Sequence, residues 1–579
     1  MGHNSEENED KVYDFNTEMG SFLPTKIKSK IERDILNDSI MKAETIVVGK
    51  DALNEFKTEY LATLAIPTLF PNGKGDATRL GMRRAIAKSD TESFSEKIKH
   101  FIKFAEFIDG KLTYRFAAHP CFGFWAYNML YRRCLLGQGS FYLKQNPGEA
   151  NLNIDELQEM MRDGTYNTVM KKLYRYAKNV TGTNAYWNQA KEQLKATINQ
   201  VGAPTIFWTP SCTEFHWQEY HALFSTDDKV DPNILRENII NNPHLIDWFF
   251  TIRVENFVKH WLYETLDAEW HWYRFEYAVM RGSIHCHGLA KLKNDPGLCE
   301  LTHKALQGHL AEQKLCQSDS EEGNILQLEA LVNKGKTAKQ QVCDYVDTLV
   351  TTYNPCTPEE GWVKPNVFPC KRKLEDLNDE DLDNDYADLV NSVQRHSKYN
   401  SAYCLRKKSN GEQYCRFNFP FENCEETYID FEEVNSMKNG KQYRPKIVFK
   451  RNDAIVNRHQ RLQLQSWRAN CDIQPIIDYN ACLEYLAKYA SKSEKISDVA
   501  RDAFISVVEN LKGTEQMRSV IQKLMIKAVG ERDFSVQEVM HHILSLKLIS
   551  SSFQVVNVSV EGSRKIEIDN EEIVTEASI

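Results

Sequence analysis

Residues 281–292, RGSIHCHGLAKL, place His285 and His287 on either side of Cys286. The run is typical of a β-strand, in which residues i and i+2 point to the same face of a sheet. The two imidazoles, about 6–7 Å apart at their base, can therefore converge on one metal ion. Cys286 points to the opposite face and is a poor ligand. The alternative is two surface or partly buried histidines on an amphipathic strand.

A tight metal site needs a third ligand, and Glu276 in the strand-like run RFEYAVMRG is the best candidate. Its odd offset from His285 puts its side chain on the wrong face of one regular strand, unless a bulge near Gly282 restores the face. Alternatively, the two residues lie on separate strands of a hairpin that turns near Arg281-Gly282. A carboxylate or amide oxygen favours Mg²⁺ or Mn²⁺, whereas an added thiolate favours zinc. The competing interpretation of Glu276 is a salt bridge to Arg274 or Arg281.

Residues 483–492, LEYLAKYASK, form a strong predicted helix. Tyr485 and Tyr489 share one face of it, with Lys492 on the same side. A phenol is a weak nucleophile at neutral pH because its pKa is near 10. A nearby ammonium and a metal-polarised phosphate favour the phenolate and stabilise a transferring phosphoryl group. The alternative is an aromatic stripe that packs into the core.

Composition bounds the class of protein. The 579 residues carry 72 Lys and Arg against 81 Asp and Glu, a net charge of −9. This balance excludes a uniformly basic nucleic-acid coat but not a local basic groove. No apolar run is long enough for a membrane span, and the polar N-terminus lacks a signal core. The 14 irregularly spaced cysteines suit reduced intracellular thiols.

Two segments have a strong charge bias. Residues 441–468 hold eight Lys or Arg and one acid, whereas residues 375–388 hold eight acids and no base. We interpret the acidic segment as a solvated linker or insertion edge. A histidine pair, a basic segment and a Tyr-Tyr-Lys helix together suit metal-assisted attack of tyrosine on a DNA phosphodiester.

Five longer stretches occur along the chain in the order in which one known family has them. The resemblance covers roughly residues 60–555. The five stretches resemble the replication-initiator (Rep) domain of Helitron rolling-circle transposons, a branch of the His-hydrophobic-His (HUH) single-strand endonucleases. The stretches are PTIFWTPSCTEFHWQEY (204–220), NPHLIDWFFTIRVENFVKHW (242–261), RGSIHCHGLAKLKNDPGL (281–298), RLQLQSWRANCDIQPIIDYNACLEYLAKYASK (461–492) and ERDFSVQEVMHHILSLKLISSSFQVV (531–556).

The resemblance carries roles to individual residues. His285 and His287 fall on the metal histidines of the family, Tyr485 and Tyr489 on its paired nucleophiles, and Lys492 on the lysine that follows them. It implies a metal-dependent endonuclease and strand transferase, which leaves a 5′-phosphotyrosine and a free 3′-OH on single-stranded DNA of the transposon ends. The basic segment would line the DNA groove. The DNA-contacting residues expected there are Lys450, Arg451, Arg458, Arg461, Trp467 and Arg468.

The sequence departs from the family pattern in three respects. The EYAVM stretch lacks a Gln that is usual before Arg-Gly, which weakens the expected metal site. The family often has a Cys/His cluster before the tyrosines. Zinc at Cys370, His396, Cys404 and Cys415 is therefore considered, but Tyr399 stands where a cysteine is common, which favours reduced structural cysteines. The chain stops just after the Rep region, so we expect a stand-alone Rep, a truncated copy or an incomplete gene model, with any helicase supplied in trans.

Two other functions stay open. A decayed Helitron-derived protein would grip single-stranded DNA without cutting it, and the EYAVM stretch favours this alternative. A zinc hydrolase that uses the histidine pair is weaker, because it lacks a third ligand at standard spacing. In each case we expect an intracellular protein, nuclear for the Rep.

The expected fold is α+β, with an HUH-endonuclease core in which an antiparallel sheet is flanked by helices and the histidines lie on a central strand. The expected organisation follows the chain. It comprises a polar N-terminus (1–50), a mostly helical lobe (51–200), the first part of the core (201–299), an inserted lobe with the acidic linker (300–440), the second part of the core with the tyrosine helix (441–500), and a C-terminal helical and strand region (501–579).

Overall fold

The computed structural model describes residues 54–576 with gaps. The gaps are residues 56, 80–92, 109–110, 153, 164, 225–230, 279–282, 318–321, 402–403, 437–439, 480–481, 483–504, 509–516, 531–533, 557–563 and 569–571. The prediction for residues 1–50 lies outside the described residues. Helices and antiparallel sheets are mixed in the described part, which confirms the α+β class.

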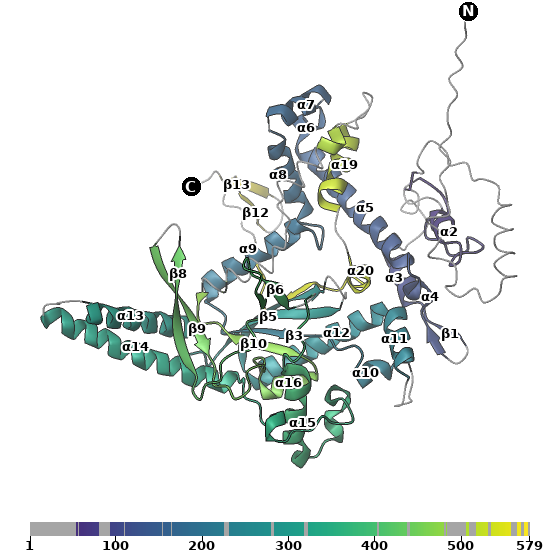
Figure 1. Cartoon of the computed structure of the whole chain (residues 1–579). Helices are drawn as coiled ribbons and strands as arrows, with labels where there is room; N and C mark the ends of the chain where they lie inside the picture. The colour runs from purple at the N-terminus through teal and green to yellow at the C-terminus, as the bar shows by residue number, and fades with distance from the viewer. Residues whose placement is uncertain are drawn as a thin grey trace, which may run out of the picture.

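A five-stranded sheet lies at the centre of the molecule (Figure 1). Every neighbouring pair is antiparallel. In order, its strands are β10 (Cys471–Pro475), β3 (Ile206–Pro210), β5 (Ile284–Leu292), β4 (Ala268–Tyr277) and β11 (Ile549–Ser551). The histidine strand β5 is therefore the middle strand, as the sequence predicted. Strand β4 directly precedes it in the chain, whereas β3, β10 and β11 come from more distant parts.

One face of the sheet packs on a helical layer. The layer consists of α12 (Pro243–Phe257), the π-helix η2 (Val258–Thr265) and α20 (Val536–Ile543). Trp208, Phe275 and Cys286 point into this core and are almost completely buried. Gly288 is required there, because a Cβ at this position would collide with the indole of Trp208. The strand therefore fits its neighbour only with glycine at that position.

The opposite face of the sheet is covered over part of its area by α9 (Asn184–Val201). Leu194 and Ile198 of this helix pack against Phe207 and Leu289. The helix begins where the Thr183 side chain accepts from the backbone N–H of Tyr186, and it ends at Gly202 with a positive φ of 90°. Trp270 and Trp272 of β4 extend this apolar cluster on the same face.

A second core lies in the N-terminal half and is mostly helical. Its elements are α2 (Leu61–Ala65), α3 (Phe94–Lys103), β1 (Glu106–Ile108), β2 (Lys111–Thr113), α4 (Arg115–Ala118), α5 (Phe122–Gln145), α6 (Pro147–Ala150), α7 (Ile154–Asp163) and α8 (Tyr166–Ala177). The C-terminal helices α19 (Met517–Gly530) and α20 pack on α5. Residues 517–530 and 534–543 thus share the core of the N-terminal lobe (Figure 1).

Two hairpins extend from the inserted region. Helices α13 (Leu298–Gln317) and α14 (Glu322–Leu349) pack along each other, and the strand hairpin β8 (Tyr428–Ser436) and β9 (Gly440–Val448) lies beside them (Figure 1). The two helices approach closely at Gly308 and Gly335, where a Cβ on Gly308 would lie 2.6 Å from the Cα of Gly335. Glycine at both positions therefore permits the contact.

The remaining elements are short. Around the inserted region they are η3 (Pro358–Glu360), η4 (Pro369–Lys371), η5 (Leu374–Asp376), η6 (Asp379–Asp381), α15 (Leu382–Leu389), η7 (Val390–Gln394), β6 (Leu405–Lys407), β7 (Gln413–Cys415) and α16 (Arg461–Trp467). Elsewhere they are α10 (Gln218–His221), α11 (Pro232–Asn241), β12 (Arg564–Ile568) and β13 (Glu572–Glu576). Among the helices described, none has the length and apolar character to cross a bilayer.

The acidic segment is only partly a solvated linker. Asp385 in α15 is buried and pairs with Arg468 and Arg372. Tyr386 and Leu389 of the same helix join the core beneath the sheet. The prediction of a solvated segment is therefore wrong for this helix, because arginines from distant segments compensate its buried charge.

Candidate metal centre on the central sheet

The hairpin of β4 and β5 places Glu276 on the histidine face. Glu276 pairs directly with His285 across the two strands, and Arg274 pairs with His287. Opposed residues of an antiparallel pair point to the same face. The odd offset in sequence is thus resolved by the predicted hairpin, and the single-strand interpretation with a bulge is wrong.

The three candidate ligands converge on one point. The imidazole centroids of His285 and His287 lie 4.9 Å apart, with their planes at 83°. Nε2 of His287 is 3.4 Å from Oε2 of Glu276. One donor atom from each of the three residues lies within 4.8 Å of the other two. We call Glu276, His285 and His287 the histidine–glutamate cluster.

Strand β3 orients His287. Oγ1 of Thr209 lies 3.0 Å from Nδ1 of the imidazole. The ring of Phe207 stacks on it, with centroids 5.6 Å apart and planes at 24°. These contacts occupy Nδ1 and direct Nε2 toward Glu276. A hydrogen-bonded second nitrogen is the usual arrangement for a histidine that binds metal.

His285 is neutral at physiological pH. Burial and the neighbouring His287 lower the pKa of His285 to about 4, although Glu276 opposes the shift. A neutral imidazole carries the lone pair that a metal ion requires. Burial also raises the pKa of the Cys286 thiol well above its usual value, and that side chain lies on the core face. The prediction that Cys286 points to the opposite face from the two histidines is confirmed.

Arg274 lies beside the cluster and was not predicted as a site residue. Its Nη2 is 3.3 Å from Oε2 of Glu276, with 9% of its side chain exposed. The guanidinium carbon lies 4.3 Å from the ring centroid of Trp187 on α9. The salt bridge between Arg274 and Glu276 that the sequence suggested is therefore present. Glu276 also belongs to the histidine–glutamate cluster. Arg281 lies outside the described residues.

The donor set fits a divalent cation. Two imidazole nitrogens and one carboxylate oxygen are ligands that Mn²⁺ accepts, and carboxylate suits Mg²⁺ as well. No thiol lies on this face of β5, since Cys286 points to the core. The chemistry of the cluster is therefore compatible with the predicted Mg²⁺ or Mn²⁺.

Comparison with known proteins gives a match that contains this cluster. Residues 107–290 match the family model of the Helitron helicase-like domain at N-terminus. This segment of the chain is therefore similar to the Helitron helicase-like domain. The match confirms the predicted resemblance over this segment, and it includes Thr209, Arg274, Glu276 and both histidines. No curated protein matches the chain.

The predicted nucleophiles lie C-terminal to the segment that matches the family model. Tyr485, Tyr489 and Lys492 are outside the described residues. The segment that leads to them is described. Ile476 and Cys482 pack with Phe207 and Leu289 on the histidine face of the sheet. Ile476 and Cys482 therefore lie on the same face of the sheet as the cluster.

Three of the predicted DNA-contacting side chains are structural, and two of them lie at the end of α16. Trp467 is fully buried and its Nε1 donates to the carbonyl oxygen of Ser211. Arg468 is buried and forms a two-pronged ion pair with Asp385. A buried ring cannot stack on a base, and a buried, paired guanidinium cannot contact a phosphate. The predictions for Trp467 and Arg468 are wrong.

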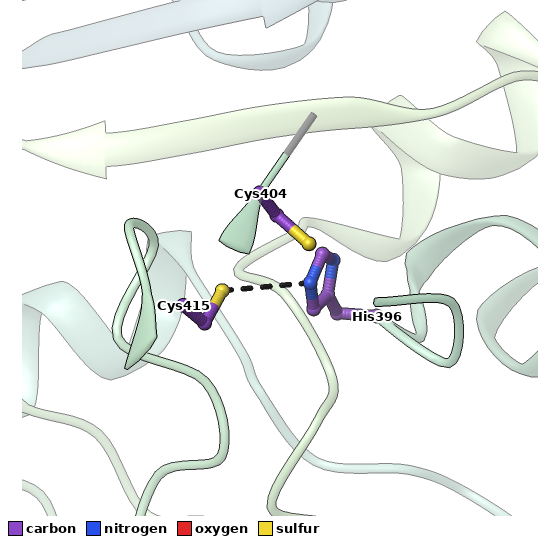
Figure 2. A group of neighbouring side chains, drawn as sticks. All are labelled: His396, Cys404 and Cys415. Carbon is purple, nitrogen blue, oxygen red and sulfur yellow. Dashed lines mark hydrogen bonds between the residues drawn. The ribbon is translucent and has the colours of Figure 1, made fainter. Parts of the chain in front are cut away.

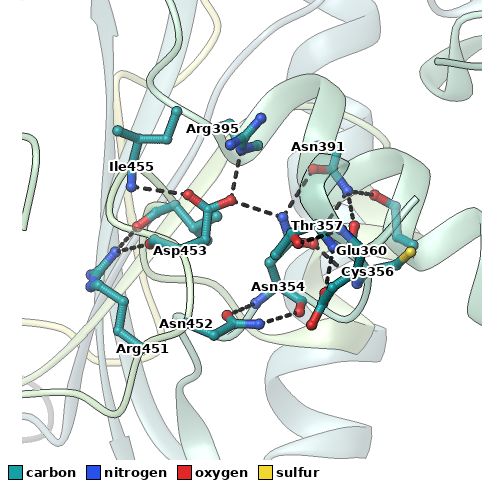
Figure 3. Close-up of polar contacts among 12 residues, drawn as sticks. Asn354, Cys356, Thr357, Glu360, Asn391, Arg395, Arg451, Asn452, Asp453 and Ile455 are labelled. Atoms are coloured by element: carbon teal, nitrogen blue, oxygen red, sulfur yellow. Dashed lines mark hydrogen bonds and ion pairs between the residues drawn. The ribbon is translucent and has the colours of Figure 1, made fainter. Parts of the chain in front are cut away.

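Arg451 is the third of these structural side chains (Figure 3). Its Nη1 donates to the carbonyl oxygens of Asp453 and Val456, at 3.1 and 2.5 Å. Asp453 in turn accepts from Arg395 at 2.7 Å and from Asn354 at 2.9 Å. This network fixes the loop between β9 and α16, so the prediction for Arg451 is wrong.

The other three predicted DNA contacts remain partly exposed. Lys450 pairs with Asp347 at 3.2 Å and Arg461 with Asp383 at 2.6 Å. Arg458 lies 3.9 Å from Asp472, which belongs to β10 beside the strand of Thr209. Partly exposed ion pairs exchange readily for phosphate contacts. DNA contact by these three residues stays a prediction.

A second group of possible ligands lies in the inserted region (Figure 2). His396, Cys404 and Cys415 each offer a donor atom within 4.8 Å of the others. Nε2 of His396 is 3.5 Å from Sγ of Cys415. The β6–β7 hairpin brings the cysteines together, since Cys404 precedes β6 and Cys415 ends β7. Cys370 is not part of this group and lies in the core under the sheet.

The site residues missed from the sequence are Thr209, Phe207 and Arg274. Arg274 stands two residues before Glu276, so strand alternation alone places it on the same face. Thr209 and Phe207 carry no such signal, because the pairing of β3 with β5 joins segments far apart in the chain.

Proposed function

We propose that the chain is a Helitron-type Rep, an HUH endonuclease that nicks and transfers single-stranded DNA in the nucleus. The observation that carries the proposal is the histidine–glutamate cluster on the middle strand of an antiparallel sheet, within a Helitron helicase-like domain. The placement of Ile476 and Cys482 on the same face supports it further. Tyr485 stands three residues after Cys482 in the sequence, a span of about 10 Å at most.

Each residue then has a defined role. Glu276, His285 and His287 would hold Mg²⁺ or Mn²⁺, which when bound would polarise the scissile phosphate and offset its developing charge. The phenol oxygen of Tyr485 or Tyr489 forms a bond to phosphorus, and the bond from phosphorus to the 3′ oxygen breaks. The phenol loses its proton, and the leaving oxygen gains one to become a free 3′-OH. Lys492 favours the phenolate form of the tyrosine.

The deciding experiment is nicking of single-stranded oligonucleotides with Mg²⁺ or Mn²⁺. The wild-type protein should give a nicked product and a covalent adduct that survives denaturing electrophoresis. The Tyr485→Phe/Tyr489→Phe variant should give neither, while Tyr479→Phe, which changes a tyrosine of the preceding segment, should retain both. Full activity in the double variant would disprove the proposal.

The ion pair between Arg274 and Glu276 favours a second candidate. In this arrangement an arginine already compensates the carboxylate. A decayed Rep would keep this pair and bind single-stranded DNA without cutting it. Salt-sensitive binding with no adduct under any metal condition would identify this second function.

We propose in addition a structural zinc ion at His396, Cys404 and Cys415. Two thiolates and one imidazole are the donors that zinc prefers. A zinc ion bound there would link the β6–β7 hairpin to His396. The residue before His396, Arg395, forms an ion pair with Asp453. Elemental analysis of purified protein should find about one zinc per chain. Cys415→Ser should remove it, while Cys316→Ser, which changes an exposed cysteine of α13, should not.

A further inference from the structure

Arg274 is held on the histidine face of the sheet by contacts on two sides. It is paired across strands with His287 and stands on the same face as both histidines. The Trp187 ring holds the guanidinium from one side, and Glu276 holds it from another. Such a side chain is pre-organised, because its rotamer is set before any ligand arrives.

The charges on the histidine face of the sheet favour the binding of an anion there. In the structure Glu276 compensates Arg274. A divalent cation bound to Glu276 and to one imidazole nitrogen of each histidine would leave an excess of two positive charges in a largely buried site. Excess buried charge is costly unless a counter-charge is present. A phosphodiester supplies one negative charge, and the attacking phenolate supplies the second.

We propose that Arg274 is a catalytic residue that contacts a non-bridging oxygen of the scissile phosphate. This inference rests on the function proposed above and adds a phosphate contact to it. A planar guanidinium presents paired N–H donors that match phosphate oxygens. Its charge stabilises the additional negative charge of the transition state. In the alternative, Arg274 only positions the carboxylate of Glu276.

The test compares Arg274→Gln with Arg274→Lys, and with Lys291→Gln as the control. Lys291 lies on the same face of β5 but four residues beyond His287, about 13 Å along the strand, and pairs with Asp295. The measurements are Mn²⁺ affinity by calorimetry, the nicking rate at saturating Mn²⁺, and oligonucleotide affinity. Thermal unfolding monitored by circular dichroism checks that each variant folds.

The proposal predicts that Arg274→Gln binds Mn²⁺ at least as tightly as the wild type but nicks about 100-fold more slowly. Arg274→Lys should recover part of the rate, and Lys291→Gln should match the wild type. A single neutral methylphosphonate at the mapped nick site should weaken binding by the wild-type protein and leave binding by Arg274→Gln unchanged.

Other results would overturn the inference. Loss of Mn²⁺ binding in Arg274→Gln, with an unchanged response to methylphosphonate, would make Arg274 a positioning residue only. Wild-type nicking rates in Arg274→Gln would exclude any catalytic role. A wild-type protein that neither binds Mn²⁺ nor nicks would instead reject the proposed function, and the role of Arg274 with it.

Discussion

The hydroxyl of Thr209 lies 3.0 Å from Nδ1 of His287, and it comes from a different strand. This contact fixes the ring so that Nε2 faces Glu276. A hydrogen bond to the non-ligating nitrogen also sets which nitrogen carries the proton. Thr209 would therefore act through His287 on a metal ion bound at the histidine–glutamate cluster.

Replacing Thr209 by Val keeps the shape of the side chain and removes its hydroxyl. We expect the affinity for Mn²⁺ to fall about tenfold, because outer-shell partners of metal ligands typically contribute this much. Thr209→Ser keeps the hydroxyl and should stay close to the wild type. Calorimetric titration with Mn²⁺ measures both. Equal affinities in the Val variant and the wild type would show that Phe207 packing alone orients the ring.

Gly288 and Trp208 make a second testable contact. Gly288→Ala places a methyl group where the buried indole lies, so β3 and β5 must separate or the indole must shift. We expect the free energy of unfolding to fall by about 1–3 kcal/mol, as for other overpacked cores. Urea denaturation measures the change.

Gly137→Ala is the matched control for that substitution. Gly137 lies within α5, and a Cβ added to it would meet no atom within 4 Å. Alanine in a helix interior should raise the free energy of unfolding by about 0.5–1 kcal/mol. If both variants were destabilised equally, the indole contact would not be the cause.

The sequence was most informative where chemistry follows local periodicity. Alternation along β5 placed His285 and His287 on one face and Cys286 on the other, and a hairpin brought Glu276 opposite His285. Strand register thus converts local spacing into a three-dimensional site. Thr209 could not be found in this way, because its position depends on pairing between distant segments.

The DNA-contact predictions from the sequence were wrong where a charged side chain pairs with a residue far away in the chain. The bias of residues 441–468 suggested a solvated basic surface, but Asp385 neutralises Arg468 and the backbone near Asp453 accepts from Arg451. Charge counts along the chain cannot reveal such pairs. Trp467 was misassigned for a related reason, since its burial depends on packing against Trp217 and Phe250.

His459 provides a prediction of pH dependence. Burial lowers the pKa of His459 to about 4. It bonds to the hydroxyl of Tyr386 at 2.8 Å and to the carbonyl oxygen of Asn457 at 2.9 Å. On unfolding, the imidazole regains a pKa near 6.5 and takes up a proton at mildly acidic pH. Stability is therefore full above pH 6.5 and falls as the pH drops toward 4.

The contribution of His459 can be isolated by His459→Gln, which offers an amide to the same two partners. Between pH 7 and pH 5 the wild type should lose about 2 kcal/mol more free energy of unfolding than the variant. Urea denaturation at both pH values gives the difference. Parallel losses in the two proteins would show that other buried histidines, such as His244, dominate the acid response.

The partly exposed cations Lys450, Arg458 and Arg461 define the remaining candidate DNA surface. We expect the triple change to Gln to weaken single-stranded DNA binding and to reduce the slope of log affinity against log salt by about 2. The reason is that DNA binding releases fewer counterions when each phosphate contact is lost. Fluorescence anisotropy across a salt series measures the slope.

The control for this surface is a triple variant of exposed, ion-paired lysines elsewhere on the molecule. Lys293, Lys336 and Lys408 each pair with a single acid and are more than half exposed. Changing all three to Gln alters the net charge of the protein by the same amount. If the DNA path runs along α16 and the end of β9, only the first variant should change the salt slope. Equal slopes in both variants would mean that net charge, rather than this surface, governs DNA binding.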